Sequence, residues 1–158
     1  MIKTVGICLL LFALIYLVKR LSSSQRRRVD VLREICALLR HIRRQVGCYL
    51  LPAREIARSY SSELLEACGF LDMMRSGENP ISSLSGEYCI SERPMQLVKG
   101  VLSSFGEGYV EDEIRALDVA IDELSALLAT EEAECAKRIK LYSVLGAAIG
   151  VGALIFIL

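Results

Sequence analysis

The sequence predicts an all-α protein, in which a cytoplasmic helical bundle is flanked by an N-terminal and a C-terminal transmembrane helix. Three observations lead to this prediction. Apolar residues recur at helical spacing, convincing strand alternation and Asn-Gly hairpin signals are missing, and both ends carry long uncharged runs. Of the 158 residues 53% are hydrophobic, and the mean hydropathy is +0.42. This composition excludes a disordered chain, and the apolar excess is concentrated at the two ends.

The first uncharged run covers the 15 residues Thr4–Val18, and the second covers the 18 residues Leu141–Leu158. As α-helices they span roughly 22 and 27 Å, close to the hydrocarbon core of about 30 Å in a bilayer. Buried core helices are the alternative, but a core helix rarely lacks a polar face over its whole length. A signal peptide would end at a small-residue cleavage site, whereas Lys19 and Arg20 follow the first run. We therefore expect two membrane spans.

Basic residues flank both runs on the side of the central part of the chain. They are Lys19, Arg20, Arg26, Arg27 and Arg28 after the first run, and Lys137, Arg138 and Lys140 before the second. Since Lys and Arg collect on the cytoplasmic side, we expect a multi-pass protein of the cell membrane with both termini outside. The predicted division is a transmembrane helix with a basic flank at 1–20, a cytoplasmic helical bundle domain at 21–140 and a transmembrane helix at 141–158.

The first half of the cytoplasmic domain is predicted to form two helices. After a break at Ser22–Ser24, one helix runs to about Gly47, and Pro52 suits the first turn of another that extends to about Arg75. The apolar seam of the first helix contains Val29, Leu32, Cys36 and Leu39, with Ile35, Leu38 and Ile42 beside it. The buried side of the second contains Ile56, Tyr60, Leu64, Ala67 and Leu71.

The second half begins with a turn-rich stretch from Ser76 to Arg93, which has room for one short helix. A helix over Met95–Phe105 ends near Gly106 and Gly108, and a long helix starts at about Glu111 and continues into the second span. Its apolar stripe at alternating spacings of three and four contains Ile114, Leu117, Ile121, Leu124, Leu128, Cys135 and Tyr142. Such a stripe favours pairing with another helix in the manner of a coiled coil.

The formal net charge is zero, but the charges are unevenly distributed. The segment 19–58 has a net charge of +8, the segment from residue 59 to the end has −9, and Lys3 supplies the remaining +1. One interpretation is that an early basic helix packs against a late acidic helix and both are neutralised. The other is that some charge stays available for a partner or for anionic lipid. Arg40, Arg43 and Arg44 are then the candidates for a protein contact, and Arg26–Arg28 for lipid.

The sequence offers little catalytic or metal chemistry. The six cysteines contain no C-x-x-C pair, and His41 is the single histidine, so neither a zinc site nor a disulfide framework is expected. Phosphate-loop, G-x-S-x-G and H-E-x-x-H motifs are also missing. We therefore expect neither an enzyme nor a cofactor nor a metal. The balanced charge likewise predicts no nucleic-acid partner.

One motif in the second span indicates close packing against another helix. Gly146 and Gly150 are four residues apart, and small residues at that spacing let another helix approach closely. The partner is either the first span or a helix of another protein. The alternative is a span that merely tolerates glycine.

The sequence resembles the stage III sporulation protein AB family over essentially its whole length. The match rests on the order of several segments: LREICALLRHIRRQ at Leu32–Gln45, Tyr49 and Pro52 before Ile56–Ala57, a Phe105-Gly106 turn before Asp112 and Glu113, and KRIKLYSVLGAAIG at Lys137–Gly150. The chain departs from the family in having no Trp and in placing Val110 where a glycine is usual.

The resemblance implies a helical cytoplasmic domain similar to the F platform protein of type II secretion. It also implies membership of the secretion-like channel complex between mother cell and forespore, with no catalysis and no cofactor. The implied partners are the cognate secretion-type ATPase, stage III sporulation protein AA, and other channel membrane proteins, with the lipid bilayer around the spans. The alternative function is a membrane-anchored signalling adaptor that forms homodimers through Ile114–Tyr142 and the glycine face.

Overall fold

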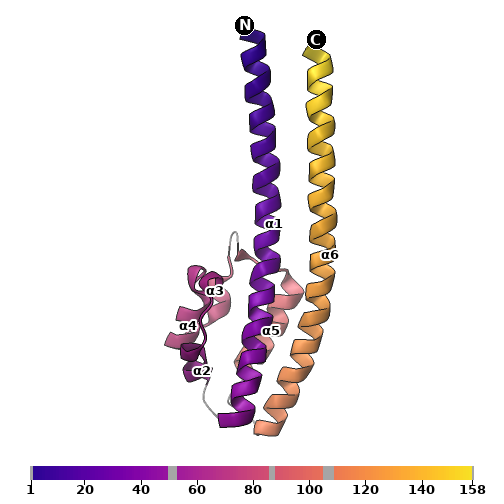
Figure 1. Cartoon of the computed structure of the whole chain (residues 1–158). Coiled ribbons are helices and arrows are strands. Elements are labelled where there is room, and N and C mark those ends of the chain that lie inside the picture. The colour runs from indigo at the N-terminus through magenta and orange to yellow at the C-terminus, as the bar shows by residue number, and fades with distance from the viewer. Residues whose placement is uncertain (1, 50–52, 86–87, 105–108, 158) are drawn as a thin grey trace. The chain divides into compact units, whose positions relative to one another are not determined.

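The structure, a computed structural model, describes residues 2–49, 53–85, 88–104 and 109–157, and every regular element in these ranges is a helix. The elements are α1 (Ile2–Tyr49), α2 (Ala53–Ser59), α3 (Glu63–Ala67), α4 (Phe70–Ser76), the 3₁₀ helix η1 (Pro80–Ser83), α5 (Glu92–Ser104) and α6 (Val110–Ile157). Figure 1 shows their order along the chain. The prediction of an all-α fold is confirmed.

The chain divides into two compact units. The terminal unit comprises Met1–Arg27 and Glu132–Leu158, and the central unit comprises Arg28–Glu131. Among the described residues, no helix combines the length and the hydropathy needed to cross a membrane. The predicted transmembrane flanks and the boundaries at 20 and 140 stay predictions.

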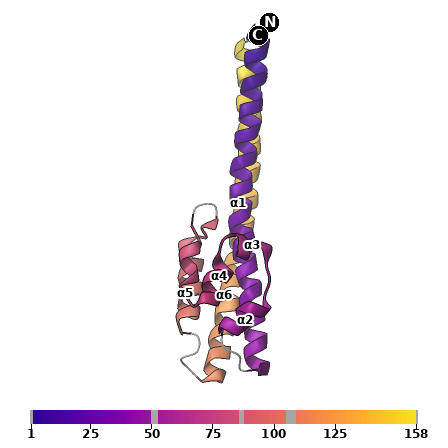
Figure 2. The same ribbon diagram turned by 90° about the vertical axis from the view of Figure 1, so that its left-hand side faces the viewer.

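The terminal unit is a pair of antiparallel helix segments. The N-terminal part of α1 and the C-terminal part of α6 lie side by side in Figures 1 and 2, with the two chain ends at the same end of the pair. Large apolar side chains are exposed along this pair: Phe12 is 76% exposed and Leu17 is 59% exposed. On α6, Leu145, Ile149 and Val151 are exposed as well.

The described residues of the central unit form one apolar core, to which each of its α-helices contributes. The seam expected on α1 is confirmed, since Val29, Leu32, Cys36 and Leu39 are all buried. On α6, Leu117, Ile121 and Leu124 are buried, and Phe70 of α4 and Val98 of α5 are fully enclosed.

The expected break at Ser22–Ser24 is wrong, because α1 continues through these residues. Serine lowers helix propensity by only about half a kcal/mol per residue, and a segment without Gly or Pro gives the helix no strong reason to stop. The helix also continues past its expected end at Gly47 to Tyr49.

The single helix expected from Pro52 to Arg75 is also wrong, because three short helices occupy that segment. Ser62 has an extended backbone and caps α3 by accepting a hydrogen bond from the Leu65 amide, so a new helix begins there. Gly69 then takes a left-handed conformation at φ 77°, which separates α3 from α4. Ala67 is consequently exposed, and Leu65 is buried in its place. Pro52 itself lies outside the described residues.

The second half follows the expectation more closely. In the described part of the turn-rich stretch there is one short helix, η1, and the Asn79 side chain just before it accepts a hydrogen bond from the Ile81 amide. Helix α5 begins at Glu92, three residues earlier than expected, because Pro94 is tolerated in a first turn. Helix α6 begins at Val110 with three acidic residues in its first turn, where the helix dipole favours them. The turn expected at Phe105–Gly108 lies outside the described residues.

Candidate functional site

The three candidate arginines lie on the exposed side of α1 in the central unit, but they make different contacts. Arg43 forms a two-pronged ion pair with Asp118 of α6, with its Nε 2.9 Å from Oδ1 and a terminal nitrogen 3.0 Å from Oδ2. The hydrogen bonds to Asp118, followed by the attraction of its charge, raise the pKa of Arg43. Arg40 donates a hydrogen bond of 2.8 Å to the Ser125 hydroxyl, also on α6. Basic α1 thus pairs with acidic α6 at Arg43.

Arg44 differs from its two neighbours. It is exposed, and within the described part of the chain it forms no ion pair and no side-chain hydrogen bond. Its charge nevertheless acts on His41: burial, and next the charge of Arg44, lower the pKa of that imidazole below 6.5. Of the candidate triad, Arg44 is therefore the residue whose guanidinium is not paired within the described part of the chain. The binding role of all three stays a prediction.

His41 belongs to a polar cluster that the sequence reasoning missed. Its ring lies 5.2 Å from the ring of Tyr60, and its Nε2 lies 3.3 Å from the Ser59 hydroxyl oxygen. Because Ser59 donates its own proton to the Ile56 carbonyl, its oxygen accepts from His41, and this favours the tautomer with the proton on Nε2. The histidine thus helps to fix the end of α2 against α1.

Glu34 is the other α1 residue in this cluster. One of its carboxylate oxygens accepts hydrogen bonds from Ser62 at 2.8 Å and from Tyr60 at 3.4 Å. Burial raises the pKa of Tyr60, and the charge and hydrogen bond of Glu34 raise it further. Glu34 therefore connects α1 to Tyr60, which follows α2, and to Ser62, which caps α3.

Arg75 of α4 holds the short helices together, and nothing in its local sequence marked it. Its Nε donates to the Ala57 carbonyl at 3.2 Å, and a terminal nitrogen donates to the Tyr60 carbonyl at 3.0 Å. Ala57 is in the last turn of α2, where carbonyls lack partners within the helix. The same side chain also contacts Glu66 and Asp72, each at 3.3 Å.

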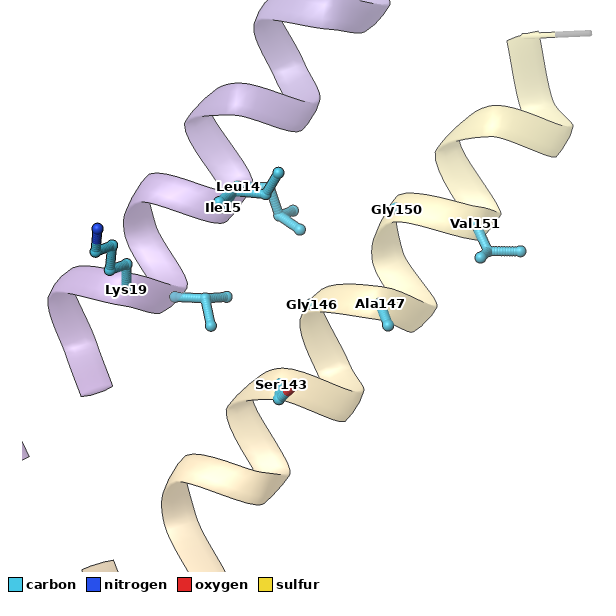
Figure 3. A pocket seen from close by; sticks show the side chains of 9 residues that line it. Leu14, Ile15, Lys19, Ser143, Gly146, Ala147, Gly150 and Val151 are labelled. Atoms are coloured by element: carbon cyan, nitrogen blue, oxygen red, sulfur yellow. The ribbon is translucent and has the colours of Figure 1, made fainter. Parts of the chain in front are cut away.

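In the terminal unit, the two candidate glycines face the groove between α1 and α6. Both are buried, and a β-carbon added at Gly146 would lie 2.9 Å from Cγ2 of Val18. The groove has a volume of about 540 Å³ and is formed by four residues of α1 and five of α6, Gly146 and Gly150 among them. Figure 3 shows Ile15 and Lys19 on its α1 side and Ala147 and Val151 on its α6 side.

The cysteines of the described part of the chain are packing residues. Cys36 and Cys135 are buried, Cys68 and Cys89 are half-buried, and all four are free thiols. Burial raises the pKa of the Cys36 thiol, which disfavours a nucleophilic thiolate. The side chains of Cys8 and Cys48 lie outside the described residues. Across the described ranges, no group of three His, Cys, Asp or Glu side chains is placed to hold a metal ion.

The comparisons with known proteins give one finding. No curated protein and no solved structure matches the chain. The family model for stage III sporulation protein AB matches residues 3–158, which is essentially the whole sequence. This chain, with its arginine-bearing central unit and its pair of apolar terminal helices, belongs to the stage III sporulation protein AB family.

Proposed function

We propose that this protein is a non-enzymatic membrane platform of the sporulation channel complex and that its central unit docks the cognate secretion-type ATPase. Family membership supports a role in sporulation. The observation that carries the rest of the proposal is the division of the chain into an apolar helix pair and a separate helical unit with an outward arginine.

The terminal unit supports membrane attachment through its surface. Large apolar side chains such as Phe12, Leu17 and Ile149 are exposed, and a soluble protein rarely exposes so many. The unit also contains eight Lys and Arg against two Glu, a net charge of +6. Cations beside an apolar helix favour the cytoplasmic leaflet, so we propose that residues 28–131 lie in the cytoplasm and that both termini lie outside.

The central unit supports docking of an acidic partner at one place on α1. Arg43 and Arg40 are engaged by Asp118 and Ser125, which leaves Arg44 as the charge available beside them. An exposed cation at the edge of an interface steers an acidic partner and contributes to its association rate. We propose that the secretion-type ATPase presents acidic side chains to this α1 face.

The polar clusters support a structural role for the central unit. Arg75, Ser62 and Glu34 all form hydrogen bonds that hold helix ends together. These groups are therefore already used in building the fold, which is what a rigid platform requires.

The adaptor alternative finds less support. Leu117, Ile121 and Leu124 of the stripe expected to form homodimers are buried inside the central unit, and Gly146 faces Val18 of the same chain. A homodimer through these faces would require the fold to open.

The docking proposal can be tested by copurification. The full chain, purified in mild detergent, is immobilised, and retention of the purified ATPase is compared between the parent, Arg44→Glu and Arg93→Glu. Arg93 serves as the control because it is 75% exposed and lies on α5, and its ion pair with Glu123 is long, at 3.7 Å. We expect Arg44→Glu to lower retention roughly tenfold, since it places a like charge against the acidic partner, and Arg93→Glu to leave it unchanged.

Two results would contradict the proposal. If the parent chain retains no ATPase, the platform role in docking is wrong. If both variants lose retention equally, the contact depends on overall charge rather than on the α1 face.

A further inference from the structure

The groove in the terminal unit is apolar along most of its length. Leu14, Ile15 and Val18 line it from α1, and Ala147, Gly150 and Val151 line it from α6. Its volume of about 540 Å³ falls within the range of small-molecule sites, about 300–1,000 Å³. Gly146 is also part of the α6 wall, at the point where the two helices come so close that an added β-carbon would lie 2.9 Å from Cγ2 of Val18.

One part of the groove is polar and positive. Lys19 and Ser143 are the lining residues at that part, and both are exposed. Helical spacing places Lys140 one turn before Ser143 on the same face of α6, and Lys140 is exposed as well. Neither lysine forms an ion pair within the described part of the chain. The site therefore combines an apolar groove with Lys19 at its polar part and with Lys140 one turn away on α6.

We propose that this groove is a binding site for one anionic phospholipid, with an acyl chain along the apolar side chains that line it and the phosphate bound by Lys19 and Lys140. The inference rests on the proposed attachment of the terminal unit to the membrane. Cationic pockets between membrane helices on the cytoplasmic side recognise such headgroups, and the net charge of +6 on this unit attracts anionic lipid.

The lining distinguishes a lipid from the other occupants. A packed helix has a diameter of about 10–12 Å and would bring its own apolar side chains against the Lys19 ammonium, which an apolar helix cannot satisfy. A free phosphate has no apolar surface to place against the apolar lining of the groove. An amphiphile with an anionic head satisfies both parts of the groove.

The test measures lipid bound to the full chain purified in detergent, by native mass spectrometry with added phosphatidylglycerol, phosphatidylcholine or glycerol phosphate. We expect one phosphatidylglycerol to bind in preference to phosphatidylcholine, and glycerol phosphate not to bind. Lys19→Gln should weaken phosphatidylglycerol binding about fivefold, as expected for one cation beside an anionic headgroup. Arg20→Gln removes the same charge from a residue that does not line the groove, so it should have a much smaller effect.

A second pair of variants tests the apolar part. Ala147→Phe fills the groove and should abolish selective binding, whereas Ala148→Phe places the same ring on an exposed neighbour outside the lining and should not. Equal losses in Lys19→Gln and Arg20→Gln, or unchanged binding in Ala147→Phe, would overturn the proposal in favour of diffuse electrostatic attraction. Binding of glycerol phosphate would overturn it in favour of a simple anion site.

Flotation of the parent and the four variants with phosphatidylcholine vesicles separates this inference from the proposed function. If all of them float but show no lipid selectivity in detergent, the lipid site is wrong and membrane attachment stands. If the parent does not float, the proposed membrane attachment is wrong, and the lipid site that rests on it is overturned as well.

Discussion

The close approach of α1 and α6 at Gly146 gives a quantitative prediction for the terminal unit. A β-carbon at this position would lie 2.9 Å from Cγ2 of Val18, so the two must separate by about 0.6 Å to reach an ordinary carbon contact. Valine is stiff at χ1 and cannot easily rotate away. We therefore expect Gly146→Ala to carry an overpacking cost of about 1–3 kcal/mol.

Gly152→Ala provides the matched control, because a β-carbon there has nothing within 4 Å. Both substitutions gain about 1 kcal/mol of helix propensity, which cancels in the comparison. We expect Gly152→Ala to exceed Gly146→Ala in free energy of unfolding by about 1–3 kcal/mol, measured by denaturant titration of the full chain in mild detergent. The difference should shrink in a Val18→Ala background, where the clashing methyl is gone.

Two outcomes would refute this reasoning. If both alanine variants have the same stability, Val18 yields at no cost and the glycine is not required for the helix pair. If the difference persists in the Val18→Ala background, its cause is not the contact between residues 18 and 146.

Three further predictions concern the central unit. Phe70→Ala should lower the free energy of unfolding by about 3–5 kcal/mol in denaturant titrations, because the ring is fully enclosed; a loss below 1 kcal/mol would mean that the core is looser than described. Arg75→Gln should cost about 1–3 kcal/mol, because two backbone carbonyls lose a charged donor, and equal stability of Arg75→Gln and the exposed Arg93→Gln would contradict this. Because the folded pKa of His41 is lowered, the unfolded chain binds its proton more tightly, and stability should fall as the pH drops below 6.5. His41 is the single histidine, so NMR can follow its titration: its pKa should lie below 6.5 and should rise in Arg44→Gln. A pKa of 6.5 that is the same in the parent and in Arg44→Gln would refute this explanation.

The helical core could be predicted because its signal is periodic and local. The α1 seam from Val29 to Leu39 repeats at spacings of three and four, so one face is apolar wherever the helix packs. The same holds for Leu117 and Leu124 on α6. In contrast, the ends of helices depend on weak signals: the serines at Ser22–Ser24 resemble a break in the sequence, but α1 continues through them.

The short helices were missed although their signals were present. Ser62 followed by acidic Glu63 is typical of a helix start, and Gly69 is typical of a helix end. The apolar spacing from Ile56 to Leu71 masked both, because this spacing also suits one continuous helix.

The contacts of the candidate site were harder to foresee. That a basic and an acidic helix neutralise each other was one of two interpretations of the charge pattern. That Arg43 meets Asp118 while Arg44 faces outward depends on the rotation of α1, which neighbouring arginines cannot reveal in one sequence. Arg75 donates hydrogen bonds to backbone carbonyls. Because every residue has a carbonyl, the sequence does not indicate which residues are its partners.

The contacts of Arg75 have a consequence for how the central unit opens. Helices α2, α3 and α4 have seven, five and seven residues, and each is too short to persist alone in water. The Arg75 side chain on α4 contacts the last turn of α2, the Tyr60 carbonyl and Glu66 of α3. The segment 53–76 should therefore detach and reattach as one cooperative unit. Its amide hydrogens would then exchange with a shared protection factor, and α1 could retain slow exchange while this segment is open.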